Sequence, residues 1–254
     1  MTQAAPSPSR EWCLFLDVDG TLLEIAETPS GVVVDPALKA LLAAVARTLN
    51  GAVALVSGRS IDVLDELFAP LKLPAAGQHG AERRSATGIL VAADPGDGSR
   101  SAQLDSARVH LKGFVDSHPG ALLEDKGRTI AVHFRQAPEL EESARRAVEI
   151  ASAALKPRYE VQEGKMVLEI KPCGINKGSA VEQFMREAPF RGRTPVFVGD
   201  DLTDEPGLRY VERAGGVSIA VGGGIEGQWK FDDPQRVRHW LAAIAALHET
   251  QGRS

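Results

Sequence analysis

The sequence predicts an α/β fold in which a Rossmann-like parallel sheet core carries an inserted, smaller α+β domain. Three short apolar runs each end at a polar cluster and are joined to amphipathic stretches, as expected of buried parallel strands connected by helices. Between the second and third runs, a helix-strand-strand pattern occurs twice. The length agrees, because 254 residues suffice for one large or two moderate domains.

The first strand and the helix after it have clear boundaries. Trp12 to Leu16 is an apolar run of the kind found in strands that are buried on both faces. Asp35 can cap a helix whose first position is Pro36, and apolar residues recur at helical spacing until Asn50 and Gly51. The sequence therefore predicts a strand, a polar segment and an amphipathic helix, in that order.

Two further strands repeat this pattern. Val53 to Val56 ends at a serine and a glycine, and Ser60 can cap the helix that follows. Pro195 to Val198 ends at a glycine and a run of acids, and a helix expected at Ser179 to Arg186 precedes it. Open α/β sheets bind ligands at the C-terminal ends of their strands, so we expect the three polar clusters to form one site.

The middle of the chain contains two helices that are each followed by a pair of strand-like runs, with hairpin signals between the runs. Turn-forming residues on both sides place the core at residues 1–84 and 171–254 and the insert at 85–170. The expected helices are Leu104 to Val115 and Glu139 to Leu155, and the expected strands are Ala121 to Glu124, Thr129 to Arg135, Arg158 to Val161 and Met166 to Ile170.

Composition excludes several classes of protein. Hydrophobic residues make up 43% and charged residues 25%, as in soluble globular proteins, and no apolar run is long enough to span a membrane. The net charge of −5 gives no general attraction for nucleic acids or anionic membranes. The two cysteines do not suggest a zinc site or a disulfide framework, and the first dozen residues do not form a signal peptide. We therefore expect a cytoplasmic, monomeric protein whose partner is a small molecule.

Two carboxylates follow the first strand at alternate positions. Asp17 and Asp19 belong to the segment Asp17 to Thr21 (DVDGT), and alternation along a strand directs both side chains to the same side. Neighbouring carboxylates repel each other, so the pair needs a divalent cation between them or a proton on one of them. A solvated turn after a strand is the alternative interpretation.

A second acidic segment follows the third strand. Gly199 to Glu205 (GDDLTDE) contains four acids, and oxygen ligands at the end of a strand are those that Mg²⁺ prefers. Asp201 or Thr203 could instead cap a helix, although capping does not account for all four acids. We expect a mixture of metal ligands, residues that orient them, and a cap.

Weaker signals lie near the ends of the same strands. Lys177 precedes a helix, where its charge and the N-terminal amides could hold a phosphoryl group, although a lysine there is commonly solvated. Ser57 and Gly58 offer a hydroxyl and an open amide at the second strand end. His79 follows a strand end in the core and could face the same site, whereas His133 lies within a strand-like run and is expected to be structural.

Together, these segments resemble the haloacid dehalogenase-like (HAD-like) hydrolases. Phosphatases of that superfamily use a DxDGT segment, a Ser or Thr after the second strand, a Lys and a GDxxxD cluster in this order, and all four are present here. The catalytic segments specify only the superfamily, whereas the insert segments distinguish the trehalose branch. From about Leu14 to Trp240 the chain is similar to bacterial trehalose-6-phosphate phosphatases, in Gly77 to Arg83 (GQHGAER), Glu124 to Lys126 (EDK), His133 to Arg135 (HFR), Lys165 to Pro172 (KMVLEIKP) and Gly199 to Glu205.

The resemblance implies a phosphatase of trehalose biosynthesis that depends on Mg²⁺, with a cap domain at residues 85–170 that selects the substrate. Asp17 would be the nucleophile and form an aspartyl-phosphate, and Asp19 would act as general acid and then as general base. Mg²⁺ would bind the Asp17 carboxylate, the main-chain carbonyl of Asp19, and Asp200.

The resemblance also assigns roles to the residues around these acids. Ser57 and Lys177 would complete the catalytic set by holding phosphoryl oxygens, and Asp201 and Asp204 would orient the metal ligands. In the core, the residues expected to bind substrate are Gly58, Arg59, His79 and Gly80.

The expected substrate is trehalose 6-phosphate, and the cap would recognise its sugar rings. Glu124 and Lys126 from the first hairpin and Glu169 from the last strand offer carboxylate acceptors and an ammonium donor for sugar hydroxyls. An ion pair with little effect on function is the alternative interpretation of these three residues.

Two other functions remain compatible with the sequence. A phosphatase for another sugar phosphate, such as sucrose 6-phosphate, would share the same catalytic core. A binding or regulatory domain could retain the fold without turnover, because a fold alone does not establish a function. The intact set of acids argues against the second alternative.

Overall fold

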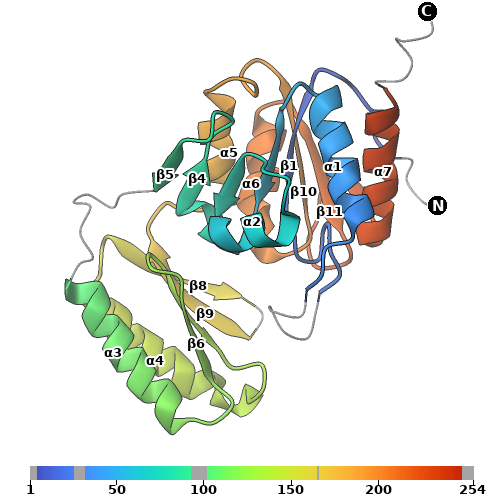
Figure 1. The fold of residues 1–254 in the computed structure, drawn as a ribbon. Coiled ribbons are helices and arrows are strands. Elements are labelled where there is room, and N and C mark those ends of the chain that lie inside the picture. The colour runs from blue at the N-terminus through green and yellow to red at the C-terminus, as the bar shows by residue number, and fades with distance from the viewer. Residues whose placement is uncertain (1–4, 26–31, 93–101, 165, 248–254) are drawn as a thin grey trace, which may run out of the picture. The chain divides into compact units, whose positions relative to one another are not determined.

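The computed structural model of the chain describes residues 5–25, 32–92, 102–164 and 166–247 (Figure 1). The chain forms two compact units, one of residues 1–91 and 176–254 and the other of residues 92–175. We call the first the sheet unit and the second the insert unit. No helix in the described ranges is long and apolar enough to cross a membrane.

The described strands of the sheet unit form one sheet in the order β12-β11-β10-β1-β2-β3-β4-β5. Neighbours from β12 to β3 run parallel, and β4 runs antiparallel to β3. The polar segments after β10, β1 and β2 therefore leave the sheet at the same edge. The strands are β1 Trp12–Leu16, β2 Val53–Val56, β3 Ala75–Gly77, β4 Glu82–Arg84, β5 Leu90–Ala92, β10 Thr194–Gly199, β11 Val217–Val221 and β12 Trp229–Phe231.

The helices of the sheet unit begin at capping residues. Asp35 and Ser60 accept hydrogen bonds from main-chain N–H groups in the first turns of α1 and α2, as predicted. Asn176 forms a capping box with Ser179, so α5 begins at Lys177, two residues earlier than expected. Figure 1 shows α1 beside α7 and α5 beside α6. The helices are α1 Pro36–Thr48, α2 Ile61–Phe68, α5 Lys177–Met185, α6 Glu205–Arg213 and α7 Pro234–Ala246.

Strand β1 is buried on both faces because helices cover the sheet from two sides. The ring of Phe15 contacts that of Phe184 in α5, with centroids 5.9 Å apart, whereas Trp12 contacts Trp240 in α7, with centroids 5.8 Å apart. Residues 12 and 15 point to opposite faces of a strand, so α5 and α7 lie on opposite faces of the sheet. This double burial explains the unbroken apolar run in the sequence.

The insert unit has two layers, a sheet in the order β6-β7-β9-β8 with antiparallel neighbours and two helices on one face. Val132 and Leu168 belong to the core beneath the helices. Ala131 pairs with Glu124 on one side and with Glu169 on the other, so these three residues share the opposite face. The elements are α3 Ala102–Ser117, β6 Leu122–Asp125, β7 Ile130–His133, α4 Glu141–Ala153, β8 Tyr159–Gly164 and β9 Val167–Pro172.

The predicted α/β class and the repeated helix-strand-strand pattern are confirmed, with differences at the edges. The sheet is mixed rather than wholly parallel, because β4 runs antiparallel to β3. Strand β5 extends the sheet into the stretch that was expected to be a turn-rich boundary. Strand β9 continues to Pro172 because it pairs with β8. The two units consequently divide at 91/92 and 175/176, a few residues beyond the expected 84/85 and 170/171.

We predict that Phe184→Ala strongly destabilises the sheet unit. The Phe184 side chain is fully buried and contacts Phe15 and Phe190, with ring centroids 5.9 and 5.0 Å away, so truncation should cost about 3–5 kcal/mol. All three tryptophans of the chain lie in the sheet unit, so urea unfolding followed by tryptophan fluorescence reports on it. Val109→Ala, at an exposed position of the insert unit, is the control. Equal losses in the two variants would contradict this assignment of the core.

Candidate active site

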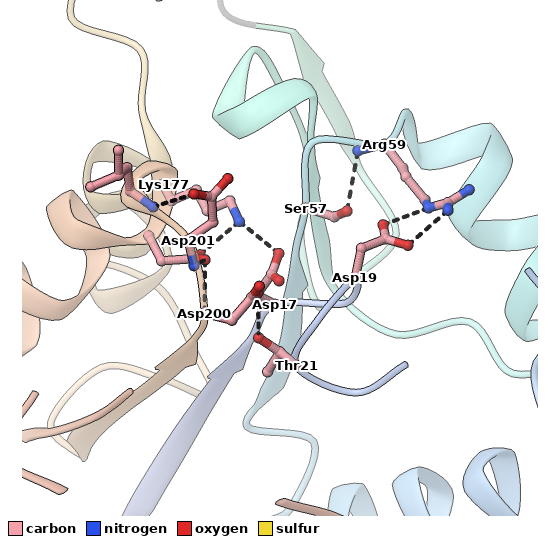
Figure 2. A network of polar contacts seen from close by, with 10 residues as sticks. Asp17, Asp19, Thr21, Ser57, Arg59, Lys177, Asp200 and Asp201 are labelled. Atoms are coloured by element: carbon pink, nitrogen blue, oxygen red, sulfur yellow. Dashed lines mark hydrogen bonds and ion pairs between the residues drawn. The ribbon is translucent and has the colours of Figure 1, made fainter. Parts of the chain in front are cut away.

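Polar segments that are far apart in the sequence meet at one edge of the sheet. Strands β10, β1 and β2 are adjacent and parallel, so their C-terminal ends lie side by side. Asp17 follows β1, Ser57 follows β2 and Asp200 follows β10. Figure 2 shows the side chains of these segments grouped in one region.

The buried ammonium of Lys177 connects two of the aspartates. Lys177 is the first residue of α5 and is 2% exposed. Its Nζ lies 2.6 Å from Oδ1 of Asp17 and 2.6 Å from Oδ1 of Asp204 (Figure 2). Burial alone would lower the pKa of Lys177, but the charges of Asp17 and Asp204 outweigh it and raise the pKa. The lysine therefore stays charged and holds both carboxylates in place.

The buried side chain of Asp204 holds the main chain of the acidic segment after β10. Its side chain is fully buried, and its Oδ2 accepts hydrogen bonds from the main-chain N–H groups of Asp200 and Asp201, each at 3.1 Å. Burial and the charge of Asp17 raise the pKa of Asp204 to about 7, although Lys177 acts in the opposite direction. Asp201 caps the 3-10 helix that follows, as one interpretation of the sequence proposed. Asp204 thus orients the loop that carries Asp200.

Three carboxylates in this region could hold a metal ion. Oxygen atoms of Asp17, Asp200 and Asp204 lie within 4.8 Å of one another. Both oxygens of Asp204 already accept hydrogen bonds, so Asp17 and Asp200 are the better candidates for ligands. Burial, together with the charges of Asp17 and Asp204, raises the pKa of Asp200 to about 8. A divalent cation would remove this repulsion, and the hard oxygen donors fit Mg²⁺.

Two residues of the segment after β1 position Asp200. The hydroxyl of Thr21 donates to Oδ1 of Asp200 at 3.0 Å. Gly20 has a φ of +85°, and a Cβ at this position would lie 2.1 Å from Oδ2 of Asp200, so a side chain would collide with the carboxylate. Sequence reasoning missed this contact of Thr21 with Asp200. The only signal for it was the place of Thr21 at the end of the DVDGT segment.

Asp19 has a different cationic partner from Asp17. Arg59 donates from Nε and Nη2 to the two carboxylate oxygens of Asp19, at 2.6 and 2.7 Å. Figure 2 shows the Asp19 carboxylate turned toward Arg59 rather than toward Lys177. Strand β1 ends at Leu16, before both aspartates, so strand alternation does not govern their directions. Arg59, which was expected to bind substrate, here contacts the residue expected to move protons.

A main-chain hydrogen bond connects Ser57, after β2, with His79, after β3. The Oγ of Ser57 accepts a hydrogen bond from the Arg59 N–H at 3.1 Å, and its main-chain oxygen accepts one from the His79 N–H at 2.9 Å. A Cβ on Gly58 would lie 2.7 Å from Cε1 and Nε2 of His79, so the imidazole lies directly against this glycine. Gly80 follows His79 with a φ of +105°. The structure thus brings these residues together beside the end of β2.

Charged residues of the insert unit gather on the sheet face that the helices leave open. The Nζ of Lys126 lies 3.2 Å from Oε1 of Glu169 and 3.6 Å from Oε2 of Glu124. The hydroxyl of Thr129 donates to Oε1 of Glu169 at 2.9 Å, and His133 Nε2 lies 2.9 Å from Oε2 of Glu124. We call these five residues the insert cluster. Sequence reasoning grouped Glu124, Lys126 and Glu169 but missed Thr129, and it assigned His133 only a structural role.

The insert cluster favours the ionised form of Glu124 although this residue is partly buried. Burial would raise the pKa of Glu124, but the hydrogen bond with His133 and the charge of Lys126 outweigh it and lower the pKa. Glu169 is 4% exposed, and Lys126 and Thr129 both contact its Oε1. The ion pairs that the alternative interpretation expected between Lys126 and the two glutamates are therefore present. Thr129 and His133 add hydrogen bonds to the same glutamates.

A parallel sheet with aspartates after its central strand, a lysine at a helix N-terminus, acids after the next strand and an inserted domain defines a HAD-like α/β protein. Solved structures share this fold. The C-terminal domain of Candida albicans trehalose-6-phosphate phosphatase is 20% identical, with a TM-score of 0.80 over 94% of this chain and 93% of that chain. A HAD superfamily protein from Bacteroides thetaiotaomicron is 16% identical, with a TM-score of 0.62 over 98% of both chains.

The sequence comparisons define the family. The model of the trehalose-phosphatase family matches residues 15–239, and the chain belongs to this family. It is 43% identical over 244 residues to the trehalose-6-phosphate phosphatase of Escherichia coli (strain K12), covering 94% of this chain and 88% of that protein. It is 41% identical over 240 residues to a probable trehalose-phosphate phosphatase of Sinorhizobium fredii, covering 93% of this chain and 89% of that protein.

We predict that Asp200→Asn stabilises the metal-free protein and abolishes its response to Mg²⁺. The amide can still accept the hydrogen bond from Thr21, but it no longer repels Asp17 and Asp204. The melting temperature should therefore rise by a few degrees without divalent cations, and adding Mg²⁺ should raise it in the parent protein but not in the variant. Glu205→Gln is the control. A Mg²⁺ response of equal size in the parent and in Asp200→Asn would rule out this metal site.

Proposed function

We propose that this protein hydrolyses trehalose 6-phosphate to trehalose and inorganic phosphate through an aspartyl-phosphate. The observation that carries the proposal is the contact of buried Lys177 with Asp17, which fixes a carboxylate beside Asp200 at the end of the central strand. The identity of 43% with the Escherichia coli phosphatase, over 94% of this chain, supports the substrate. A cytoplasmic location and a monomeric state stay predictions.

In the first step, Asp17 attacks the phosphorus atom. Lys177 binds Oδ1 of Asp17, so we assign the attack to Oδ2. The P–O bond to Asp17 forms while the P–O bond to the sugar oxygen breaks, and that oxygen takes a proton from the Asp19 carboxyl group. Arg59 must release at least one oxygen of Asp19 before this carboxyl group can reach the sugar oxygen.

In the second step, Asp19 acts as a base. Its carboxylate takes a proton from a water molecule whose oxygen attacks the phosphorus of the aspartyl-phosphate. The P–O bond to Asp17 then breaks, inorganic phosphate leaves, and Asp17 returns as a carboxylate. Asp19 is protonated again, so both residues are ready for a second turnover.

The phosphoryl oxygens need donors throughout the reaction. Lys177 uses two of its three N–H groups for Asp17 and Asp204 among the described residues, so the third can donate to a phosphoryl oxygen. The Ser57 hydroxyl lies at the end of the adjacent strand and can donate to another. We assign Asp17, Asp200 and the Asp19 main-chain carbonyl as ligands of Mg²⁺, which supplies positive charge against the repulsion between carboxylate and phosphate.

The insert cluster is the part that we assign to recognition of the sugar. A disaccharide has many hydroxyls and no charge beyond its phosphate, so its recognition needs fixed acceptors and donors. Glu124 and Glu169 supply acceptors, and Lys126 supplies a donor. Thr129 and His133 restrict the rotamers of the two glutamates, which preorganises the acceptors before substrate arrives.

One experiment tests the proposal against its alternatives. Phosphate release should be measured with the 6-phosphates of trehalose, sucrose, glucose and mannose in the presence of Mg²⁺. We expect kcat/KM for trehalose 6-phosphate to exceed the others by about 100-fold, because groups built to bind hydroxyls reject analogues that leave them unpaired. A similar kcat/KM for another sugar phosphate would contradict the assignment of trehalose 6-phosphate as the substrate. No phosphate release from any of the four compounds would favour a binding domain.

We predict that Asp17→Asn folds and binds trehalose 6-phosphate but loses roughly 10³-fold or more in kcat, because an amide oxygen is a poor nucleophile. Acid quenching of the parent reaction followed by mass spectrometry should yield a phosphorylated peptide that contains Asp17, and the variant should yield none. Asp62→Asn, at an exposed position in the first turn of α2, is the control and should keep the parent rate. Turnover of Asp17→Asn near the parent rate would refute the covalent mechanism.

We predict that substituting Glu124, Lys126 or Glu169 by Ala separates two activities. Each variant should lose about 10-fold or more in kcat/KM for trehalose 6-phosphate, since a hydrogen bond to a charged group is lost. Hydrolysis of a small aryl phosphate, which lacks the sugar, should stay within about twofold of the parent rate. Glu163→Ala is a matched control in the same sheet, because Glu163 is exposed and pairs with Arg145 outside the insert cluster. Equal losses on both substrates, or none on either, would refute the assigned role of the insert cluster.

A further inference from the structure

An open cavity of about 480 Å³ lies in the sheet unit, away from the candidate active site. Four arginines line it, together with one acid and three uncharged residues; the charged residues are Arg10, Glu11, Arg47, Arg191 and Arg193. We call it the arginine cavity. An excess of cations in one cavity contrasts with the net charge of −5 of the whole chain. The local charge therefore favours an anion.

The arginine cavity is at the opposite end of the sheet from the acids. Arg10 and Glu11 precede β1, and Arg191 and Arg193 precede β10, whereas Asp17 and Asp200 follow these same strands. Strand β1 is five residues long, so its two ends are roughly 16 Å apart. A ligand in the arginine cavity would not occupy the catalytic site.

Two of the arginines are held rigidly by the main chain. Arg193 donates from Nε to the oxygen of Pro189 at 2.9 Å and from Nη1 to the oxygens of Arg10 and Trp12, at 2.8 and 3.1 Å. Arg10 in turn donates to the main-chain oxygen of Leu247. These contacts hold both side chains against the segments before β1 and after α7. They also fix two cationic groups before any ligand arrives.

The remaining two arginines have no such anchoring role. Among the described residues, no acceptor contacts the guanidinium group of Arg47 or of Arg191, and both residues are exposed. Arg47 lies in the last turn of α1, where its charge interacts favourably with the helix dipole, but this does not require a cavity. Both guanidinium groups therefore keep all their donors available for a ligand.

We infer that the arginine cavity binds a small anion with two or more phosphate groups. Guanidinium groups form paired hydrogen bonds with phosphate oxygens, and several of them on one cavity match a ligand with several phosphates better than a single one. A volume of about 480 Å³ lies within the range of cavities that hold small molecules. The exposed carboxylate of Glu11 reduces the positive charge but leaves the arginines in excess.

Inorganic pyrophosphate is the probe that tests this inference, by isothermal titration calorimetry in metal-free buffer of low ionic strength. The double variant Arg47→Gln/Arg191→Gln should bind pyrophosphate at least about tenfold more weakly than the parent protein. The control is Arg146→Gln/Arg186→Gln, which makes the same change in net charge at exposed arginines outside the cavity and should bind as the parent does. Turnover of the aryl phosphate should be unchanged in both double variants, which checks that they are folded.

Three results would overturn the inference. The first is a failure of the parent protein to bind pyrophosphate at millimolar concentration, and the second is an equal loss of affinity in the two double variants. In the third case, sulfate at the same ionic strength binds the parent as tightly as pyrophosphate, which would show a general attraction for anions. Pyrophosphate bound at the catalytic site does not affect this test, because the variant Arg47→Gln/Arg191→Gln retains that site. The test uses only the difference in affinity between the parent protein and this variant.

Discussion

The ion pairs of buried Lys177 with Asp17 and Asp204 are the interactions on which the rest of the active site depends. An ammonium group that is almost fully removed from water is costly unless carboxylates compensate it. Two carboxylates at 2.6 Å provide this compensation, and each is attached to a different strand end. The lysine thereby ties the segment after β1 to the segment after β10. Its own position is set by the Asn176 capping box, which starts α5 at Lys177.

Compensation of Lys177 leaves an excess of negative charge, and this excess is the basis of the proposed metal site. Asp17, Asp200 and Asp204 lie together with a single buried ammonium group. The raised pKa values of Asp200 and Asp204 express the unfavourable repulsion that remains. Asp204 is satisfied by two main-chain N–H groups, whereas Asp200 has Thr21 alone among the contacts described above. The repulsion is thus concentrated where we propose that a cation and a phosphate bind.

The sequence was sufficient to predict the strands whose burial leaves a continuous apolar pattern. Strand β1 and the caps of α1 and α2 follow directly from the residue types. Strands β3 and β4 have three residues each and are made of small or charged side chains, so no periodicity marks them. Strand β3 depends on pairing with β2, and β4 depends on pairing with β3, and both pairings are tertiary contacts. The two units divide a few residues beyond the boundaries that turn signals indicated, because β5 and the end of β9 also depend on pairing.

The candidate site was predictable as a location but not as a set of contacts. Strand ends in a parallel sheet must meet, so the grouping of Asp17, Ser57 and Asp200 follows from topology. The pairing of Asp19 with Arg59 does not, because it depends on the path of two loops after their strands end. Thr129 beside Glu169 is likewise a tertiary contact, between the residue before β7 and strand β9. Residue types thus indicated the chemistry, and only the fold assigned the partners.

The free energy of interaction between Lys177 and Asp17 tests the central claim most directly. It can be measured in a double-mutant cycle with Lys177→Met and Asp17→Asn, by urea unfolding of the metal-free protein followed by tryptophan fluorescence. The account predicts that Lys177→Met is strongly destabilising alone and less so in the Asp17→Asn background, with a coupling of at least about 2 kcal/mol. Additive effects of the two substitutions would contradict it, because the lysine would then not be held by the carboxylate of Asp17.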